Sequence, residues 1–495
     1  MRRGAYVDSV KLMQVSRTIA SLPGVSAALV AMATDLNREL ASGMGFTLPD
    51  TAGPNEMLVA VEAESDEAVS AAIDEVDVVL NAVSVPASSG FGSPPAPLTI
   101  GAAAARSGDA SVALVSTPGQ YAFADAVDSI DAGLHTMVFS DNMPVEQEVA
   151  LKRYAEPAGV LVMGPDCGTA VIGGVGLGFA NVVRPGPVGI VAASGTGAQH
   201  LMTLLDESGV GVSHCVGVGG RDLSELVGGL STLRALQLLD ADEATEIIVV
   251  VSKPPAASVA RTVREHAECL GKPVLFGLLG KGQPDITETA RRTVEALGRS
   301  WHLAGILDSS AVAARETPAS AQTNRCLRGL FAGGTLCDEA MLLAADRLGP
   351  VRSNIPLEPG WALGDELASD GHTMIDFGDD RLTQGRPHPM IDGSIRVARL
   401  LREIEDPMCG VVLLDVVLGH GAAADPASEL APGIESATAA GIPVVVTLVG
   451  TRDDPQDRDR QAQVLNDAGA WVFFSNAEAT RAAIDLLNDP IGAVR

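Results

Sequence analysis

One turn occurs twice in this chain, and it constrains the fold more than any other feature. The first copy reads GPVGIVAASGTGAQHLMTLL from Gly186, and the second reads LRGLFAGGTLCDEAMLLAA from Leu327. In both copies a short apolar run typical of a buried strand stops at small residues, and an amphipathic helix begins there. Thr196 aligns with Thr335, and Met202 aligns with Met341. The repeat predicts two related α/β domains in one chain.

The same turn predicts an anion site. The first N–H groups of a helix have no partner inside the helix and lie at the positive end of its dipole, so they suit a phosphate. The predicted binding residues are Ser194, Gly195, Thr196 and Gly197 in the first copy, and Gly333, Gly334 and Thr335 in the second. The alternative is that Ser194 or Thr196 is only an N-cap. The second copy has the weaker case, because no basic residue lies near it in sequence.

Composition excludes several classes of function. The 495 residues are too many for one core, and 46% hydrophobic with 19% charged residues fits a large globular α/β protein. A formal net charge of −28 and 3% aromatic residues oppose binding to nucleic acid or to an anionic membrane. No apolar run long enough for a membrane span and no secretory signal is visible, so we expect a cytoplasmic protein. The six cysteines form no CxxC pair, and we expect neither structural zinc nor disulfides.

The pattern along the chain predicts the domain organisation. Residues 1–98 predict a small α+β domain, with strands at 25–32 and 57–63, followed by a Pro-, Gly- and Ser-rich linker. From Thr99 onward strands and helices alternate, which predicts doubly wound parallel sheets. The boundaries that we predict for these α/β domains are 99–185, 186–318 and 319–495, with an exposed linker at 309–324.

Further polar residues follow predicted strands, at the sheet edge where open α/β folds bind ligands. Gly219 and Gly220 permit close approach to a ligand, although an ordinary turn explains them equally well. Lys253 and Lys281 could neutralise phosphate charge, although each is individually more typical of a solvated loop. Cys167 follows a strand too, and there a small buried thiol is favoured over a nucleophile.

The predicted catalytic residues are Arg386 and His388, in the segment GRPHPM. Two prolines hold His388 in a stiff extended segment, and Arg386 suits a carboxylate or phosphate. The acidic loop at 376–380 is a candidate for Mg²⁺, with a solvated loop as an equal alternative. His420 in GHGA could transfer a proton or accept a phosphoryl group, although an ordinary loop histidine is the favoured interpretation.

Several ordered motifs carry a family resemblance. The order GPDCGTA, GFANVV, GPVGIVAASGTGAQ, GVGGRDLS and VSKPP resembles the α-subunit of succinyl-CoA synthetase over about residues 99–310. With VDSVKLM, VFSDN, FAGGTL, GRPHPMID and LLDVV added, the whole chain is identified as a member of the FdrA family. The resemblance implies a CoA-binding-like Rossmann domain at 99–185 and flavodoxin-like ligase domains at 186–318 and 319–495. It also implies CoA as a candidate cofactor.

The resemblance also implies a mechanism, with departures. In the synthetase, two facing helix N-termini from different subunits hold a phosphohistidine, and SGTG at 194–197 matches one of them. Residues 333–335 would supply the second within one chain. The family's phosphohistidine loop follows a strand that corresponds to GKPVLFGLLGKG, but here QPDITETARR follows without a histidine, and His420 lies in the wrong domain. No ATP-grasp domain is visible, so nucleotide chemistry would need another subunit.

These points lead to three hypotheses about function. FdrA proteins are associated with oxamate carbamoyltransferase, which converts oxalurate and phosphate to oxamate and carbamoyl phosphate in allantoin (purine) breakdown and needs no phosphohistidine. We therefore expect a subunit of a phosphate-dependent carbamoyl- or acyl-transfer enzyme. The alternatives are an NDP-forming acyl-CoA synthetase subunit and a non-catalytic regulatory subunit. The expected partners are phosphate, carbamoyl or acyl phosphate, and other subunits of an oligomer.

Overall fold

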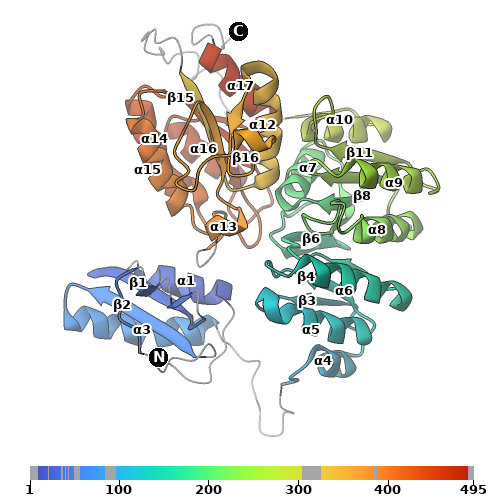
Figure 1. Ribbon diagram of the computed structural model, residues 1–495, viewed down its shortest axis with the longest axis horizontal. Helices are drawn as coiled ribbons and strands as arrows, with labels where there is room; N and C mark the ends of the chain where they lie inside the picture. Colours follow the sequence, from blue (N-terminus) through green and yellow to red (C-terminus); the bar gives the residue numbers. More distant parts are fainter. Residues whose placement is uncertain are drawn as a thin grey trace. The chain divides into compact units, whose positions relative to one another are not determined.

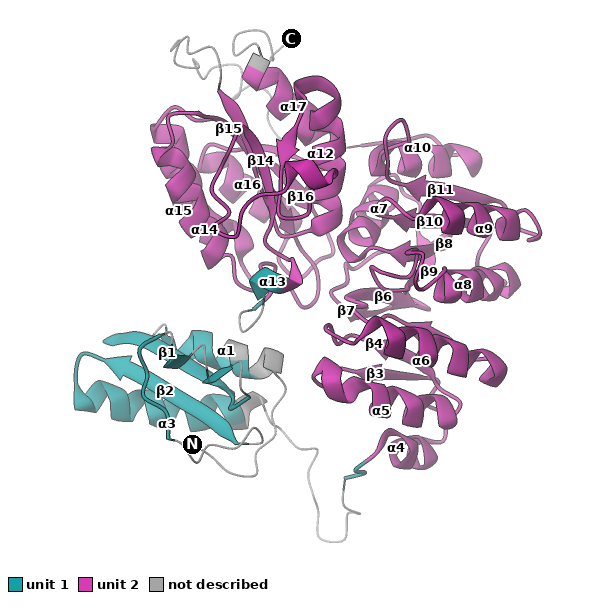
Figure 2. Ribbon diagram, viewed as in Figure 1, with its two compact units in different colours: residues 1–98, 381–387 teal, residues 99–380, 388–495 magenta. Residues whose placement is uncertain are grey.

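The computed structural model describes residues 9–20, 22–34, 37–38, 41–42, 44–49, 56–83, 96–303, 325–383 and 387–488. Two compact units divide the chain (Figure 2). Unit 1 comprises residues 1–98 and 381–387, and unit 2 comprises residues 99–380 and 388–495.

Unit 1 contains a two-stranded antiparallel sheet. The strands are β1 (Val25–Met32) and β2 (Met57–Ala63), with Val30 opposite Val59. Two helices, α1 (Ser9–Ala20) and α3 (Asp66–Val83), contact these strands and each other. Their apolar faces enclose a small core around Leu12, Val15 and Val76. The predicted α+β domain is confirmed.

The first part of unit 2 is a three-stranded parallel sheet. Its strands are β3 (Val112–Val115), β4 (His135–Val138) and β5 (Val162–Met163), and they lie side by side in chain order. Its helices are α4 (Ile100–Ser107), α5 (Gly119–Asp131) and α6 (Val145–Ala158). Because the strand order does not reverse, this sheet has no topological switch point.

The second sheet of unit 2 has six strands (Figure 1). Across the sheet they are β11 (Val274–Leu278), β10 (Ile247–Ser252), β8 (Pro185–Ala193), β9 (Val212–Gly217), β6 (Thr169–Ile172) and β7 (Val175–Gly178). The first four are parallel, and β6 and β7 extend the sheet in antiparallel fashion. Its helices are α7 (Gly195–Glu207), α8 (Leu230–Ala241), α9 (Ala257–Ala267) and α10 (Ile286–Ala296). Residues 169–178, which the sequence grouped with the preceding domain, thus extend this sheet.

The third sheet of unit 2 is entirely parallel. Across the sheet its strands are β13 (Val351–Arg352), β14 (His372–Asp376), β12 (Cys326–Phe331), β15 (Cys409–Val417), β16 (Val444–Val449) and β17 (Trp471–Phe473). Its helical segments are α12 (Gly334–Leu348), η1 (Pro359–Trp361), α14 (Ser394–Glu405), α15 (Pro426–Ala439), α16 (Arg458–Asp467) and α17 (Asn476–Asn488). The short helix α13 (Asp380–Thr383) spans the boundary between the units.

Both copies of the repeated turn lie at switch points. In the second sheet β8 lies between β9 and β10, and in the third sheet β12 lies between β14 and β15, so the strand order reverses at both. In open α/β sheets such a point, at the carboxyl ends of the strands, is where ligands bind. Helices α7 and α12 begin there. The predicted class of several doubly wound α/β domains with a small α+β domain is confirmed.

No helix among the described residues combines the length and the apolar character that crossing a bilayer requires. The cytoplasmic location stays a prediction.

Candidate functional site

The N-termini of α7 and α12 meet in unit 2, although they lie far apart in sequence. Ser194 is the N-cap of α7, and its Oγ accepts a hydrogen bond from the Gly197 N–H at 2.9 Å. The same Oγ lies 2.6 Å from the Oγ1 of Thr335 in the first turn of α12. We call residues 194–197 together with residues 333–335 the helix junction. The structure thus brings the two predicted anion-binding turns together.

Small residues allow this close approach. A Cβ added to Gly333 would lie 2.7 Å from Thr196 Oγ1, and a Cβ added to Gly197 would lie 2.9 Å from Thr335 Cγ2. The first intrahelical bond of α12 runs from Cys337 N–H to the Gly333 carbonyl at 3.0 Å. The N–H groups that precede it have no acceptor within the helix. Two positive helix ends therefore converge at one place, which favours an anion.

Lys253 brings a positive charge to the helix junction from another strand. It follows β10, its side chain is half-buried, and a Cβ added to Gly334 would lie 2.7 Å from its Nζ. Burial opposes its charge, but the carboxylates of Asp338, Asp376 and Asp166 outweigh burial and raise the pKa of Lys253. The second turn copy thus receives a basic neighbour from the other six-stranded sheet.

Asp376 ends β14 beside the start of α12. Its Oδ1 accepts a hydrogen bond from Gly378 N–H at 2.9 Å, and a Cβ added to Gly334 would lie 2.5 Å from its Oδ2. Burial raises the pKa of Asp376 to about 7, against the effect of Lys253, and burial raises the pKa of Asp338 to about 6. Among the described residues no group of three or more His, Cys, Asp or Glu is placed to hold a metal ion. We therefore assign no Mg²⁺ to the acidic loop.

His388 lies next to Asp376. A Cβ added to Gly378 would lie 2.8 Å from His388 Nε2 and 3.1 Å from Asp376 Oδ1. The Nδ1 accepts a hydrogen bond from Met390 N–H at 3.2 Å, which assigns the proton of the neutral ring to Nε2. Burial, helped by the charge of Arg396, lowers the pKa of His388 to about 4. Near neutral pH its Nε2 is therefore a hydrogen-bond donor. The other predicted catalytic residue, Arg386, lies outside the described residues.

Gly219 and Gly220 lie beside residues 165 and 166. The nearest neighbour of a Cβ on Gly219 would be the Pro165 carbonyl at 2.4 Å, and that of a Cβ on Gly220 would be Asp166 Oδ2 at 3.6 Å. Gly219 has φ +88°, so glycine is required there by the backbone. These two glycines thus pack against the turn that contains Cys167. Burial raises the pKa of the Cys167 thiol to about 12, as expected of a buried thiol and not of a nucleophile.

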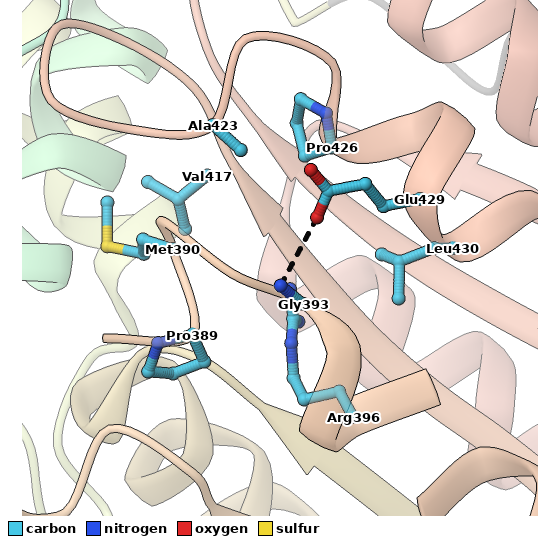
Figure 3. Close-up of a pocket in the computed structure, with 9 residues that line it drawn as sticks. All are labelled: Pro389, Met390, Gly393, Arg396, Val417, Ala423, Pro426, Glu429 and Leu430. Atoms are coloured by element: carbon cyan, nitrogen blue, oxygen red, sulfur yellow. Dashed lines mark hydrogen bonds between the residues drawn. The ribbon is translucent and has the colours of Figure 1, made fainter. Parts of the chain in front are cut away.

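Two residues that the sequence analysis missed support the α12 start. Asp415 accepts hydrogen bonds from the N–H groups of Ala332 at 2.7 Å and Gly333 at 2.9 Å, and Arg396 donates to Asp415. The sequence feature that could have identified Asp415 is a carboxylate within the apolar run CGVVLLDVV, which forms a strand buried at every position. Arg396 borders a small hollow (Figure 3). Its lining comprises Pro389, Met390, Gly393, Arg396, Val417, Ala423, Pro426, Glu429 and Leu430.

Comparison with known proteins gives two family models. The model described as CoA-ligase matches residues 330–486, and the model described as AllF, heavy metal-associated domain matches residues 1–95.

Individual relatives match over different extents. "Uncharacterized protein YahF" of Escherichia coli (strain K12) is 38% identical over 501 residues, which covers 96% of both chains. The succinate–CoA ligase [ADP-forming] subunit alpha 2 of Archaeoglobus fulgidus is 28% identical over 188 residues, 37% of this chain and 63% of its own. Among solved structures, the dinucleotide-forming acetyl-coenzyme A synthetase 1 of Ca. Korarchaeum cryptofilum, in complex with phosphate and ADP, matches at 16% identity and a TM-score of 0.30. That match covers 83% of this chain and 88% of the synthetase chain.

The residues of unit 1 do not fit a thiophilic metal. Soft metals prefer cysteine and histidine ligands. Residues 1–98 contain neither, since the first histidine is His135 and the first cysteine is Cys167. We derive no step through a metal in unit 1.

The three-stranded sheet lacks the arrangement by which open α/β sheets bind dinucleotides. Nucleotides bind at a switch point, over a glycine-rich turn between a strand and a helix. The sheet β3–β4–β5 has no reversal of strand order, and no G-x-G-x-x-G occurs in residues 99–163. We therefore derive no step through CoA bound to this sheet.

Proposed function

The chain belongs to the FdrA family together with YahF, and from that premise we propose that its helix junction binds the phosphoryl group of a small acyl phosphate. The matches to the CoA-ligase model and to succinate–CoA ligase make the chain an acyl-CoA ligase-like subunit. The observation that carries the proposal is the face-to-face contact of the α7 and α12 starts within one chain.

Each residue of the helix junction has a role in this proposal. The first-turn N–H groups of α7 and α12 would bind the phosphoryl oxygens, and the hydroxyls of Ser194 and Thr335 would rotate from each other to these oxygens. Lys253 would neutralise a further negative charge. When an acyl group transfers to a nucleophile, the C–O bond to phosphate breaks and its electron pair leaves with the phosphate. Donors already fixed around that leaving group stabilise the developing charge.

His388 would act on the acyl part of the same ligand. Its Nε2–H donates near neutral pH and lies beside Asp376, so it can polarise a carbonyl oxygen. Arg386 stays a prediction for the substrate carboxylate.

A second candidate is carbamoyl transfer, and the loop after β11 favours it. This loop runs from Leu279 to the N-cap Asp285 and reads LGKGQPD, without the histidine that a phosphohistidine mechanism requires at that place. In carbamoyl transfer a phosphate oxygen attacks the ureido carbon of oxalurate. The C–N bond then breaks, and the oxamate nitrogen takes up a proton. This reaction needs binding sites for a phosphate and a carboxylate, and it needs no phosphohistidine.

The test is a thermal-unfolding titration of the full chain with inorganic phosphate, acetyl phosphate, carbamoyl phosphate and CoA, with sulfate as an anion control. A ligand at 100 times its Kd stabilises the folded state by about 2.7 kcal/mol. Stabilisation by acetyl phosphate supports the main proposal, and stabilisation by carbamoyl phosphate alone supports the second candidate. If none of the three phosphate ligands stabilises the chain, both the main proposal and the second candidate are contradicted. From the form of the three-stranded sheet we expect no response to CoA by this chain alone.

Variants place the response at the helix junction. Thr335→Val removes the hydroxyl and keeps the side-chain shape, so the phosphate response should weaken. The matched control is Thr293→Val in α10, where the hydroxyl donates to the Thr289 carbonyl within its own helix at 2.8 Å. An equal response from both variants would move the binding site away from the helix junction.

A further inference from the structure

Asp415 is a buried carboxylate in the middle of a sheet. It follows Leu414, which pairs with Leu330 of β12, so its side chain reaches the residues just beyond the end of β12. One carboxylate oxygen accepts from Ala332 N–H at 2.7 Å and the other from Gly333 N–H at 2.9 Å. A charged group in such a place is costly unless it is paired and hydrogen-bonded. The groups that Asp415 binds therefore indicate the role of this buried carboxylate.

The two N–H groups that donate hydrogen bonds to Asp415 lie just outside the first turn of α12. Gly333 is the N-cap and makes no side-chain cap. An ordinary N-cap side chain would accept from an N–H group within the first turn and so occupy it. Asp415 instead fixes the turn from a neighbouring strand. Within the part of the chain that the structure describes, the N–H groups of Gly334, Thr335 and Leu336 have no side-chain acceptor, and they are left for a ligand.

Arg396 on α14 pairs with the side chain of Asp415. Its Nη1 donates to Asp415 Oδ1 at 2.9 Å and to the Asp415 carbonyl at 2.6 Å, and the arginine is 2% exposed. Burial lowers the pKa of Arg396, an effect that Asp415 and Glu429 oppose, and burial raises the pKa of Asp415, an effect that Arg396 opposes. Each group therefore favours the charged form of the other, against the effect of burial.

The orientation of Arg396 is set by Asp415. Its Nε has no hydrogen-bond partner among the described residues, although it is buried beside the hollow lined by Gly393 and Glu429 (Figure 3). A buried donor without a partner is unfavourable. The guanidinium keeps this orientation because it gains the two hydrogen bonds to Asp415.

We propose that Arg396 and Asp415 are positioning residues for the helix junction, which fix the Ala332–Gly333 turn while leaving the first-turn N–H groups of α12 for the phosphoryl group. This inference rests on the proposed function. Arg396 also cancels the charge that Asp415 would otherwise place close to the bound anion. Neither side chain touches the ligand.

The test measures the affinity of the full chain for inorganic phosphate by calorimetry. Asp415→Asn loses one acceptor, and Arg396→Met loses the charge and both hydrogen bonds, so each variant should bind phosphate about tenfold more weakly. Arg396→Lys keeps a charge that can reach Asp415 and should bind nearly as well as the parent chain. If Arg396 only filled space, Arg396→Lys and Arg396→Met would bind phosphate with the same affinity, because both side chains fill the space.

Arg399→Met is the matched control. Arg399 lies on the same helix and is also buried, but its Nε pairs with Glu403. It should lower stability without changing phosphate affinity. If the parent chain binds phosphate and both Arg396→Met and Asp415→Asn, shown to be folded, bind equally well, the positioning role is wrong. If Arg396→Met does not fold, the phosphate affinities of Asp415→Asn and Arg396→Lys test the positioning role instead. If the parent chain binds no phosphate, the proposed function fails, and this inference fails with it.

Discussion

At the scale of residues, polar and charged side chains from four separate strands meet at the helix junction. Lys253 follows β10, Asp376 ends β14, Ser194 follows β8, and Asp415 lies within β15. Burial brings the pKa of Asp376 close to neutrality, so small changes in its surroundings change its charge. Single substitutions at this place should therefore alter ligand binding and its pH dependence more than they alter the fold.

The first prediction concerns Lys253. Lys253→Met removes the cation next to the start of α12, and phosphate affinity should fall about tenfold, as for loss of a hydrogen bond to a charged group. Calorimetry with inorganic phosphate measures the change. Lys281→Met is the matched control, because Lys281 is exposed in the loop after β11. Equal affinities of the two variants would exclude Lys253 from the site.

The second prediction concerns the pH dependence of stability. The pKa of Asp376 is about 7 in the folded chain and about 4 in the unfolded chain. The folded state therefore binds the proton more tightly, and the contribution of this group to the free energy of unfolding is complete below about pH 4. That contribution is lost as the pH rises through 7, on the order of a few kcal/mol. Asp376→Asn should therefore flatten the free energy of unfolding between pH 4 and 8. Asp74→Asn, at an exposed position of α3, is the control and should leave the slope unchanged.

At the scale of elements, the two helix starts approach each other closely at two glycines, Gly197 and Gly333. A Cβ added to Gly333 would lie within 2.8 Å of three side-chain atoms of Thr196. A buried hydrogen-bond network holds the same two helices further along. Asn476, the first residue of α17, donates from Nδ2 to Glu339 Oε2 at 2.7 Å and from its backbone N–H to His200 Nε2 at 3.2 Å. His200 belongs to α7 and Glu339 to α12, so Asn476 bridges both ligase-type domains.

The third prediction tests the packing of the helix starts. Gly333→Ala should destabilise the chain by about 1–3 kcal/mol through overpacking and should weaken phosphate binding. Adding Thr196→Gly removes the clashing atoms and should restore part of the stability. Gly360→Ala, where a Cβ would meet nothing within 4 Å, should leave stability nearly unchanged in the same chemical denaturation series. A neutral Gly333→Ala would mean that the helix starts are not held together.

The fourth prediction tests the bridge. Asn476→Ala removes the two hydrogen bonds that Nδ2 donates to the Leu336 carbonyl and to Glu339 on α12, which should cost about 2–4 kcal/mol, while the backbone bond to His200 stays. The two large sheets should then unfold in separate calorimetric transitions. Gln463→Ala, at an exposed position of α16, is the control. A single transition at an unchanged temperature would show that the network does not couple the domains.

At the scale of the whole molecule, the chain combines two large α/β domains of related design with a separate small unit. Both large domains present a helix start at a switch point, and one chain therefore contains both halves of the helix junction. Unit 1 matches a heavy-metal-associated model, yet it has no cysteine or histidine.

The fifth prediction follows from that composition. Titration of the full chain with Zn²⁺ or Cu⁺ should give no tight 1:1 complex in unit 1, because carboxylates and thioethers alone bind these ions weakly compared with thiolate and imidazole. The measurement is metal content after gel filtration. The background variant is Cys269→Ser with His420→Ala, which removes an exposed thiol and an exposed imidazole of unit 2. A stoichiometric complex that survives in this background would contradict the prediction.

The sequence by itself determined the local elements and the repeated turn. The strands predicted at 25–32 and 57–63 are β1 and β2, and both Gly-Thr pairs begin helices, because apolar period and glycine placement act over a few residues. The three-dimensional structure was needed to show that β6 and β7 join the second sheet, and that Lys253, Asp376 and Asp415 surround one helix start. These are contacts between strands far apart in the chain. Sheet order and domain packing set them, and no local pattern of residues encodes either.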